Sequence, residues 1–405
     1  MRWLKFALLN VLRNRRRGVV TILIIAVGCT GILVSGGFAL YTYDSLREMS
    51  ARESGHLILA HSGYFDQQEE SPMALGLSDY QVIRQSLSEN PAIRAVLPRV
   101  EFTGLISNGD KSSVFVGNGV EVDEFKVKGP FLKVVSGSIL SSHPAQRSDP
   151  QILIGEGLAR IMNARVGDSL TLMSTTVDGG LNAQDVVVQG IISLGVPEID
   201  KRILLTRVAT AQALLQTDKV STLSIYLQQT DDTDRMGAEI ATLHPELDMQ
   251  TWLDTAFYYL AVRSLYNHIF GLLGAIILGM VFFAVTNVVS MSVVERTREI
   301  GTLRAMGTHP REVIRNFVLE ALVMGGLSVI LSMGLAAATA LIFSLAGLEM
   351  PPPPSRSQGY PLIIYVDGVL YLITGVCVLL LCLFAAWFAS RKAARKPLVE
   401  ALNHV

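Results

Sequence analysis

The chain is poor in charge and in cysteine, and both shortages are unevenly distributed. Charged residues make up 17% of its 405 residues, whereas hydrophobic residues make up 50%. The three cysteines, Cys29, Cys377 and Cys382, all lie in long apolar runs. Residues 44–268, which join the first two of these runs, therefore have no disulfide and must rely on their own hydrophobic core.

Motifs typical of nucleotide-binding and catalytic proteins are also missing. There is no G-x-x-x-x-G-K-[ST] phosphate loop, no G-x-S-x-G elbow and no H-E-x-x-H pair. The seven histidines are scattered, and the closest pair, His56 and His61, is more typical of surface histidines than of metal ligands. We therefore expect no catalytic, metal or cofactor-binding residues in this chain.

Charge is absent altogether from four long stretches, residues 18–43, 269–294, 321–348 and 368–390. A bilayer core about 30 Å thick requires about 20 apolar residues in a helix, so each stretch predicts one transmembrane helix. Without an Asp, Glu, Lys or Arg inside these helices, a mechanism driven by protons or ions is disfavoured.

The charges outside the predicted spans divide the chain into two kinds of segment. Residues 1–17 hold six basic residues and no acidic one, and the 295–320 loop and the 391–405 tail are also rich in basic residues. Residues 44–268 hold 28 acidic residues against 18 Lys and Arg. The positive-inside rule places the termini and the 295–320 loop in the cytoplasm. It places residues 44–268 and the 349–367 loop outside.

The N-terminal segment 1–17 combines basic residues with Trp3 and Phe6. This pattern predicts a cytoplasmic amphipathic lead-in that lies under the inner leaflet, with simple topogenic charge as the alternative. The apolar run that follows is too long for the core of a cleavable signal peptide, and no clean small-x-small site follows it. We interpret it as an uncleaved anchor.

Residues 44–268 show strand and helix patterns in alternation, which indicates an α+β domain of one or two lobes. We expect strands at 56–60 and 220–228, and helices at 77–90, 206–216 and 232–244. Residues 151–173 predict a strand, a helix, a Gly-Asp turn and a second strand, and another strand follows at 186–195. Loops are expected at 138–150 and 175–185.

The stretch from 292 to 316, between the second and third spans, contains five arginines and three glutamates. Its apolar positions recur three to four residues apart, as on one face of a helix: Val293, Thr297, Ile300, Leu303 and Met306. Gly307 is expected to end this helix, and Thr308 or His309 followed by Pro310 to begin the next one. The pattern favours a charged helix that docks on a cytoplasmic partner over a solvated loop that only sets topology.

Two stretches carry a resemblance to a known family. "ERTREIGTLRAMGTHPREVIRNFVLEALVMG" (295–325) and "ILIGEGLARIMNARVGDSLTL" (152–172) resemble the FtsX-like, MacB-type ABC transporter permeases, which include MacB and the lipoprotein-releasing LolC and LolE. The order of one span, a large external domain and three further spans is also similar. The resemblance implies a membrane protein with four transmembrane α-helices and a large extracytoplasmic α+β domain, the type VII ABC or mechanotransmission architecture. It further implies that residues 44–268 form a MacB-like periplasmic core domain, a porter lobe with an inserted smaller lobe.

In such permeases two copies sit over two ATPase subunits, and a charged helix after the second span docks on the ATPase. Carried onto this chain, the resemblance implies that the coupling contacts are Glu295, Arg298, Glu299, Arg304, Met306 and Gly307. Since no ATPase domain is fused to the chain, it implies a separate ATPase partner that binds ATP and Mg, while this chain is not itself an enzyme. The other expected partners are a second permease copy or paralogue and a periplasmic carrier or adaptor. The acidic excess outside argues against nucleic acid as a ligand.

The favoured function is movement of a lipidated or hydrophobic substrate outward from the inner membrane or periplasm, with lipoprotein release as the first choice. One alternative is adaptor-dependent efflux of a peptide, antibiotic or glycolipid. The other is FtsX-like regulation of a periplasmic hydrolase from across the membrane. The chain is expected in the cell inner membrane as a multi-pass protein.

Overall fold

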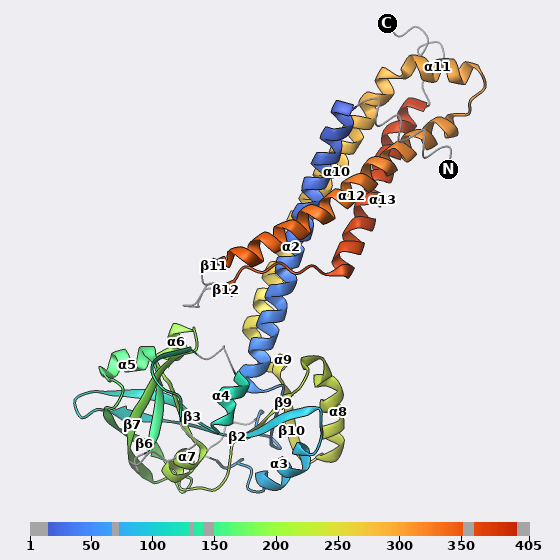
Figure 1. The fold of residues 1–405 in the computed structure, drawn as a ribbon. Coiled ribbons are helices and arrows are strands. Elements are labelled where there is room, and N and C mark those ends of the chain that lie inside the picture. Colours follow the sequence, from blue (N-terminus) through green and yellow to red (C-terminus); the bar gives the residue numbers. More distant parts are fainter. Residues whose placement is uncertain (1–14, 67–72, 129–132, 141–149, 351–359, 395–405) are drawn as a thin grey trace. The chain divides into compact units, whose positions relative to one another are not determined.

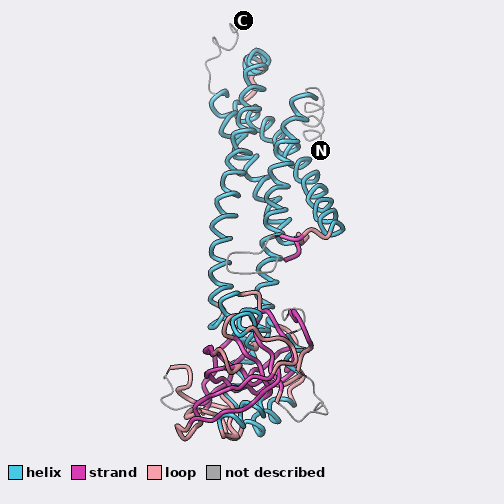
Figure 2. Tube along the Cα trace, turned by 90° about the vertical axis from the view of Figure 1, so that its left-hand side faces the viewer, coloured by secondary structure: helices cyan, strands magenta, loops and turns pink. Residues whose placement is uncertain are grey.

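The computed structural model describes residues 15–66, 73–128, 133–140, 150–350 and 360–394 (Figure 1). They form two compact units, a bundle of long helices and an α+β domain. Apart from two two-residue strands, the strands belong to the α+β domain (Figure 2). Most of the predicted lead-in, the proline-rich stretch from 351 to 359 and the end of the C-terminal tail lie outside the described residues.

Within the described residues, four helices are long and apolar enough to cross a membrane. They are α2 (Arg15–Ser54), α10 (Phe257–Glu295), α12 (Pro310–Ala346) and α13 (Gly368–Ala394). Helices α2, α10 and α13 each contain a whole charge-free stretch, and α12 contains the third stretch up to Ala346, so the prediction of four apolar helices is confirmed. Three of these helices are much longer than the apolar stretches, because polar turns of α2, α10 and α12 continue the same backbone hydrogen bonding beyond them.

The long helices pack through an apolar core and through close approaches at small residues. The core contains Ile25, Cys29 and Leu33 of α2 together with valines of α10 and α13 and alanines of α12 and α13. A side chain at Gly37 would collide with the carbonyl oxygen of Tyr365, whose N–H donates to the Gly37 carbonyl over 3.2 Å. Only glycine allows the segment before α13 to lie this close to α2.

The first lobe of the α+β domain is a split β-α-β unit. Its elements are β1 (Leu57–His61), α3 (Tyr80–Ser88), the first half of β2 (Ile93–Ser107), β9 (Thr222–Leu227), η2 (Thr230–Asp232), α8 (Thr233–Leu243) and β10 (Leu247–Thr251). The strand order is β10-β1-β9-β2, and every neighbouring pair is antiparallel. This order is that of a β-α-β-β-α-β, ferredoxin-like lobe.

The second lobe is inserted into the first, between β2 and β9. Its elements are β3 (Ser112–Val120), α4 (Asp123–Lys128), β4 (Lys133–Gly137), β5 (Gln151–Gly155), α5 (Glu156–Met162), β6 (Ser169–Thr175), β7 (Leu181–Ser193), α6 (Pro197–Asp200), β8 (Ile203–Arg207) and α7 (Val208–Leu215). Parallel pairs, β3 with β8 and β5 with β7, occur here beside antiparallel ones. The remaining short elements are α9 (Trp252–Thr255), α11 (Thr297–Ala305), β11 (Glu349–Met350) and β12 (Tyr360–Pro361).

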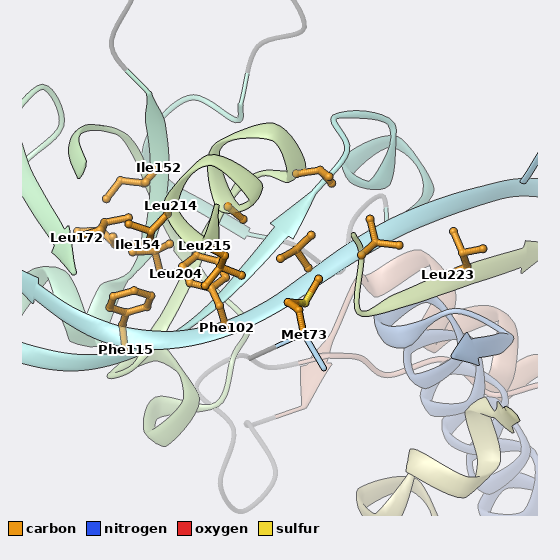
Figure 3. Packing of buried hydrophobic residues seen from close by; sticks show 14 of the residues in the cluster. Met73, Phe102, Phe115, Ile152, Ile154, Leu172, Leu204, Leu214, Leu215 and Leu223 are labelled. Carbon is orange, nitrogen blue, oxygen red and sulfur yellow. The ribbon is translucent and has the colours of Figure 1, made fainter. Parts of the chain in front are cut away.

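Strand β2 belongs to both lobes and joins their cores. Residues Ile93 to Arg99 pair with β9 of the first lobe, and Val100 to Ser107 pair with β3 of the second. Buried residues follow this strand from Leu223 and Met73 to Phe102 and Phe115, whose rings make an edge contact at 5.5 Å (Figure 3). The two lobes are therefore one folding unit with a continuous core.

Several elements lie where the sequence patterns predict them. The strand at 56–60 is β1, the helix at 77–90 contains α3, and 151–173 folds as β5, α5 and β6. The expected loop at 175–185 is wrong in its second half, because β7 begins at Leu181. That part of β7 has no hydrophobic signal of its own, because its residues alternate between exposed and half-buried positions. Its pairing with β6 holds it in the sheet.

The expectation of a surface position for His56 is wrong, since this residue is 4% exposed. The Leu227 N–H donates to its Nδ1 over 3.2 Å, and its Nε2 lies 3.0 Å from the hydroxyl of Thr230, which donates to Glu48 over 2.6 Å. This chain of bonds requires a neutral ring that donates from Nε2. It ties the last turns of α2 to the start of β1 and to the segment after β9.

Burial lowers the pKa of His56 from 6.5 to about 4; Arg52, Arg47 and Arg94 add to this effect and Glu48 opposes it. The unfolded chain binds a proton at this histidine more readily than the folded chain does. The contribution of His56 to the free energy of unfolding is therefore fully present above pH 6.5 and is lost as the pH is lowered toward 4. The loss attributable to this residue is about 3 kcal/mol. We expect the thermal unfolding temperature of the purified chain to fall over this interval.

A His56→Gln variant should have a lower unfolding temperature at neutral pH and a flatter dependence on pH between 6.5 and 4. His61→Gln, a change at the exposed end of the same strand, serves as the control and should keep the wild-type profile. Identical pH profiles for His56→Gln and wild type would contradict the assignment.

Candidate functional site

The candidate site is the segment that joins α10 to α12, residues 295–312, here called the interhelical hairpin. Helix α10 ends at Glu295 and α11 begins at Thr297 (Figure 1). Backbone hydrogen bonding continues across this break, because the Arg296 N–H donates to Ser292 O and the Ile300 N–H donates to Arg296 O. The hydroxyl of Thr297 donates to the carbonyls of Val293 and Val294, a type of side-chain bond that bends helices.

The turn between α11 and α12 follows the pattern read from the sequence. Helix α11 ends at Ala305, and Gly307 has φ +98°, the left-handed region that glycine adopts at helix ends. His309 is the extended N-cap residue of α12 and Pro310 occupies the first helical turn. The sharp reversal is therefore encoded by residues 307 to 310.

One face of α11 is buried in the core of the helical bundle. Val293 and Ile300 pack in the same cluster as Val313 and Phe317 of α12. Met306, which the spacing places on this apolar face, is instead 71% exposed, because it follows the end of α11 and precedes the turn. The hairpin thus presents a large apolar side chain to its surroundings.

A buried ion pair fixes the hairpin to α12. Nη1 of Arg296 lies 3.4 Å from Oε2 of Glu320, and the two side chains are 13% and 11% exposed. Nη2 of Arg296 is buried and has no hydrogen-bond partner in the described structure. Arg296 is not among the apolar positions of the helical pattern, and the sequence contains no signal for this role, since Glu320 lies in the following helix.

The structure brings the six predicted coupling residues into one hairpin. Glu295 is an exposed residue at the end of α10, Met306 is exposed and Gly307 forms the turn. Arg298, Glu299 and Arg304 lie on α11, whose backbone alone is described at these positions. Their contact with an ATPase stays a prediction.

A second group of buried charges, which the sequence analysis missed, lies in the α+β domain. Nη2 of Arg99 is 2.7 Å from Oε1 of Glu124, 2.8 Å from the Tyr226 hydroxyl and 2.7 Å from the carbonyl of Glu53. Burial opposes the charge of Arg99, but the attraction of Glu124 outweighs it and raises the pKa of Arg99. For Tyr226, burial itself raises the pKa of the hydroxyl. The group joins β2, α4 and β9 to the end of α2.

The architecture is that of a multi-span membrane protein of the permease type. It has four apolar helices, an α+β domain inserted between the first two, and a charged hairpin between the second and third. Residues 19–243 match the model of the MacB-like periplasmic core domain, and residues 271–398 match that of the FtsX-like permease C-terminal domain. The chain belongs to the family of permeases that combine these two domains.

Its relatives include two lipoprotein-releasing system transmembrane proteins. LolE of Haemophilus influenzae is 24% identical over 283 residues, which cover 67% of this chain and 66% of LolE. LolC of Xylella fastidiosa is 24% identical over 335 residues, which cover 78% of this chain and 76% of LolC. A macrolide export ATP-binding/permease protein, MacB of Hyphomonas neptunium, is 35% identical over 140 residues that cover 32% of this chain and 21% of MacB.

Removing one partner of the buried ion pair should loosen the hairpin. We expect Arg296→Ala to lower the stability of the bundle by about 2 kcal/mol, less than for fully buried pairs because both side chains are slightly exposed. Replacing both residues, as Arg296→Met with Glu320→Leu, should restore most of the loss. Limited proteolysis at the arginines of residues 298–315, which all variants keep, measures both effects together with thermal unfolding. Equal destabilisation in the single and double variants would contradict the pairing.

The turn at Gly307 should tolerate no side chain without strain. Gly307→Ala has open space around the new methyl group, so its expected cost of about 1 kcal/mol arises from the left-handed backbone alone. Gly326→Ala, inside α12 and also facing open space, is the matched control and should be neutral or stabilising. Thermal unfolding of the two variants gives the comparison, and a neutral Gly307→Ala would rule out the left-handed turn.

Proposed function

We propose that this chain is the permease subunit of an ABC transporter that moves a lipidated or hydrophobic substrate, with lipoprotein release favoured, outward from the inner membrane or periplasm. In this proposal a separate ATPase binds ATP and Mg, and the chain itself carries out no chemistry. The relatives named as lipoprotein-releasing proteins, which match over most of this chain, support the substrate class.

The observation that carries the proposal is the interhelical hairpin. A docking element must keep its shape when a partner pushes on it. The interhelical hairpin is held against the bundle by the buried faces of α11 and α12 and by the Arg296–Glu320 pair. It must also offer groups for recognition. Exposed Met306 supplies an apolar anchor at the tip. The charged residues in the sequence of α11 are proposed to supply orientation.

The chain also has continuous paths by which a movement at the hairpin would reach the α+β domain. Helix α10 leads from this domain to the hairpin without an interruption, and α2 likewise continues from its apolar stretch to Ser54. Both enter the domain next to the neighbouring strands β1 and β10. We infer that ATP-driven movement of the long helices is passed on to the periplasmic domain, and that substrate need not cross between the helices.

The proposed setting is the inner membrane, with both termini and the hairpin in the cytoplasm and residues 44–268 in the periplasm. The proposed complex holds two ATPase subunits, a second permease copy or paralogue, and a periplasmic carrier or adaptor. Efflux through an adaptor and regulation of a periplasmic hydrolase are the alternatives, and the co-purifying periplasmic protein decides among the three.

The test is affinity purification of the tagged chain in mild detergent, with all co-purifying proteins identified by mass spectrometry. The wild type should recover an ABC-type ATPase, and the Arg298→Glu, Arg304→Glu double variant should lose it. Met306→Asp should also weaken recovery, whereas Met306→Leu should keep it, because the expected contact is apolar.

The matched control reverses the same number of charges in the periplasmic domain, as Arg160→Glu with Arg235→Glu, two exposed residues of α5 and α8. This variant should recover the ATPase as the wild type does. Recovery of no ATPase with the wild type, from membranes that contain one, would refute the transporter proposal. Recovery that is unaffected by the hairpin variants would refute the docking role.

A further inference from the structure

A cavity of about 370 Å³ lies inside the α+β domain, beside the buried group of Arg99. Its walls come from both lobes and from the ends of two long helices, so α2, β2, β3, α4, α6, β8 and the start of α10 all contribute. The apolar part of the wall consists of Val120, Leu194, Ile199, Ile203, Leu205 and Ala256. Its size and its mostly apolar lining are those of a small-ligand site.

Polar groups without partners line the same cavity. Nη2 and Nε of Arg99 are occupied by Glu124, Tyr226 and the Glu53 carbonyl, but Nη1 has no hydrogen-bond partner in the described residues. The Arg99 side chain is 12% exposed, so these two N–H groups lack the full hydration of a surface arginine. The amide of Asn118 lines the cavity as well, and within the described structure it makes no hydrogen bond.

The polar groups of the cavity determine which polar group a bound ligand can carry. Two free N–H groups on Arg99 and the amide of Asn118 offer donors to an oxygen acceptor. The positive charge of Arg99 is already balanced by Glu124, and a second acidic residue, Glu53, also lines the cavity. A phosphate or carboxylate would meet a site with an excess of negative charge, whereas the carbonyl of an ester or amide needs only the donors.

The cavity has a neighbouring hollow with which it shares part of its wall. A second hollow, of about 460 Å³, shares Ile199 and Ile203 with the cavity and is also lined by Val116. Val116 lies on the same face of β3 as Asn118, two residues away, and is 43% exposed. Glu198 and Arg202 also line this second hollow, although most of its exposed lining is apolar. The two hollows thus offer apolar surface next to the hydrogen-bond donors of Arg99 and Asn118, an arrangement that fits a chain with a polar head.

We propose that this cavity binds an acyl chain that carries a neutral ester or amide carbonyl, with the carbonyl at Arg99 and Asn118 and the chain along Ile203, Leu205 and Val116. The proposal rests on the proposed function, because it gives the lipidated substrate a place in the periplasmic domain. The wall includes the ends of α2 and α10, so movement of these helices would change the shape of the site and release its occupant.

The test uses the purified full-length chain in phosphatidylcholine nanodiscs and a palmitoyl ethanolamide with a diazirine on its chain. After irradiation, labelled peptides are identified by mass spectrometry. We expect labelling of the peptides that contain Val116, Ile203 and Leu205. Palmitate with the same diazirine, an anionic probe of equal length, should label these peptides several-fold less.

Two variants on one strand provide the matched comparison. Asn118→Trp places a large side chain in the space proposed for the ligand and should reduce labelling about tenfold or more. Val114→Trp, on the same face of β3 but outside the cavity, should leave labelling unchanged. Asn118→Leu removes the amide without added bulk and should lower labelling about fivefold, the value of one hydrogen bond.

The proposal is overturned if label appears on the long helices alone, if Asn118→Trp and Asn118→Leu label as the wild type does, or if palmitate labels the cavity equally well. Each variant is also purified from cells to measure recovery of the ATPase. Recovery of the ATPase without cavity labelling would refute the acyl site and leave the proposed function standing. Cavity labelling without any ATPase would refute the proposed function instead.

Discussion

The antiparallel pairing of β1 with β10 is the constraint on which the connection between the α+β domain and the long helices depends. Leu57 lies opposite Thr251, so the chain leaving α2 and the chain approaching α10 are one strand spacing apart, about 4.8 Å. Trp252, next in the chain, packs with Ala51 of α2 and with Tyr259 of α10. The Arg99 guanidinium and the His56 hydrogen-bond chain hold the same end of α2. Three independent interactions therefore fasten this end of α2 to the first lobe.

The sequence patterns predicted those parts of the fold whose signal is local. Four charge-free stretches identify the long helices because a spanning helix needs continuous apolar sequence, and β5, α5 and β6 have the period expected of each. Strand β2 was missed because Pro98 and Gly104 lie within it, and its stability derives from β9 and β3, which are distant in the chain. The ferredoxin-like order of the first lobe is hidden for the same reason, since an inserted lobe separates its two halves.

The residues of the interhelical hairpin also divide into those with a local sequence signal and those whose position depends on distant parts of the chain. Gly307 and Pro310 are local signals, and the turn they predicted is present. Arg296 looked like one more surface charge, and only the fold brings it to Glu320 in the next helix. Met306 fitted the helical period but follows the last turn of α11, and its side chain is exposed. Long-range pairing and helix ends are the features that periodicity alone does not contain.

The insertion of the second lobe has a consequence for how such domains diversify. The chain leaves the first lobe after Arg99 and returns at Ser221, and these two residues are hydrogen-bonded neighbours, with the Ser221 N–H donating to the Arg99 carbonyl over 2.8 Å. Any module whose own ends lie this close together can be exchanged at the junction without disturbing the first lobe, in the way that domain insertions are accommodated elsewhere. The first lobe and its connections to α2 and α10 can therefore stay unchanged while the inserted lobe is replaced by one with a different surface.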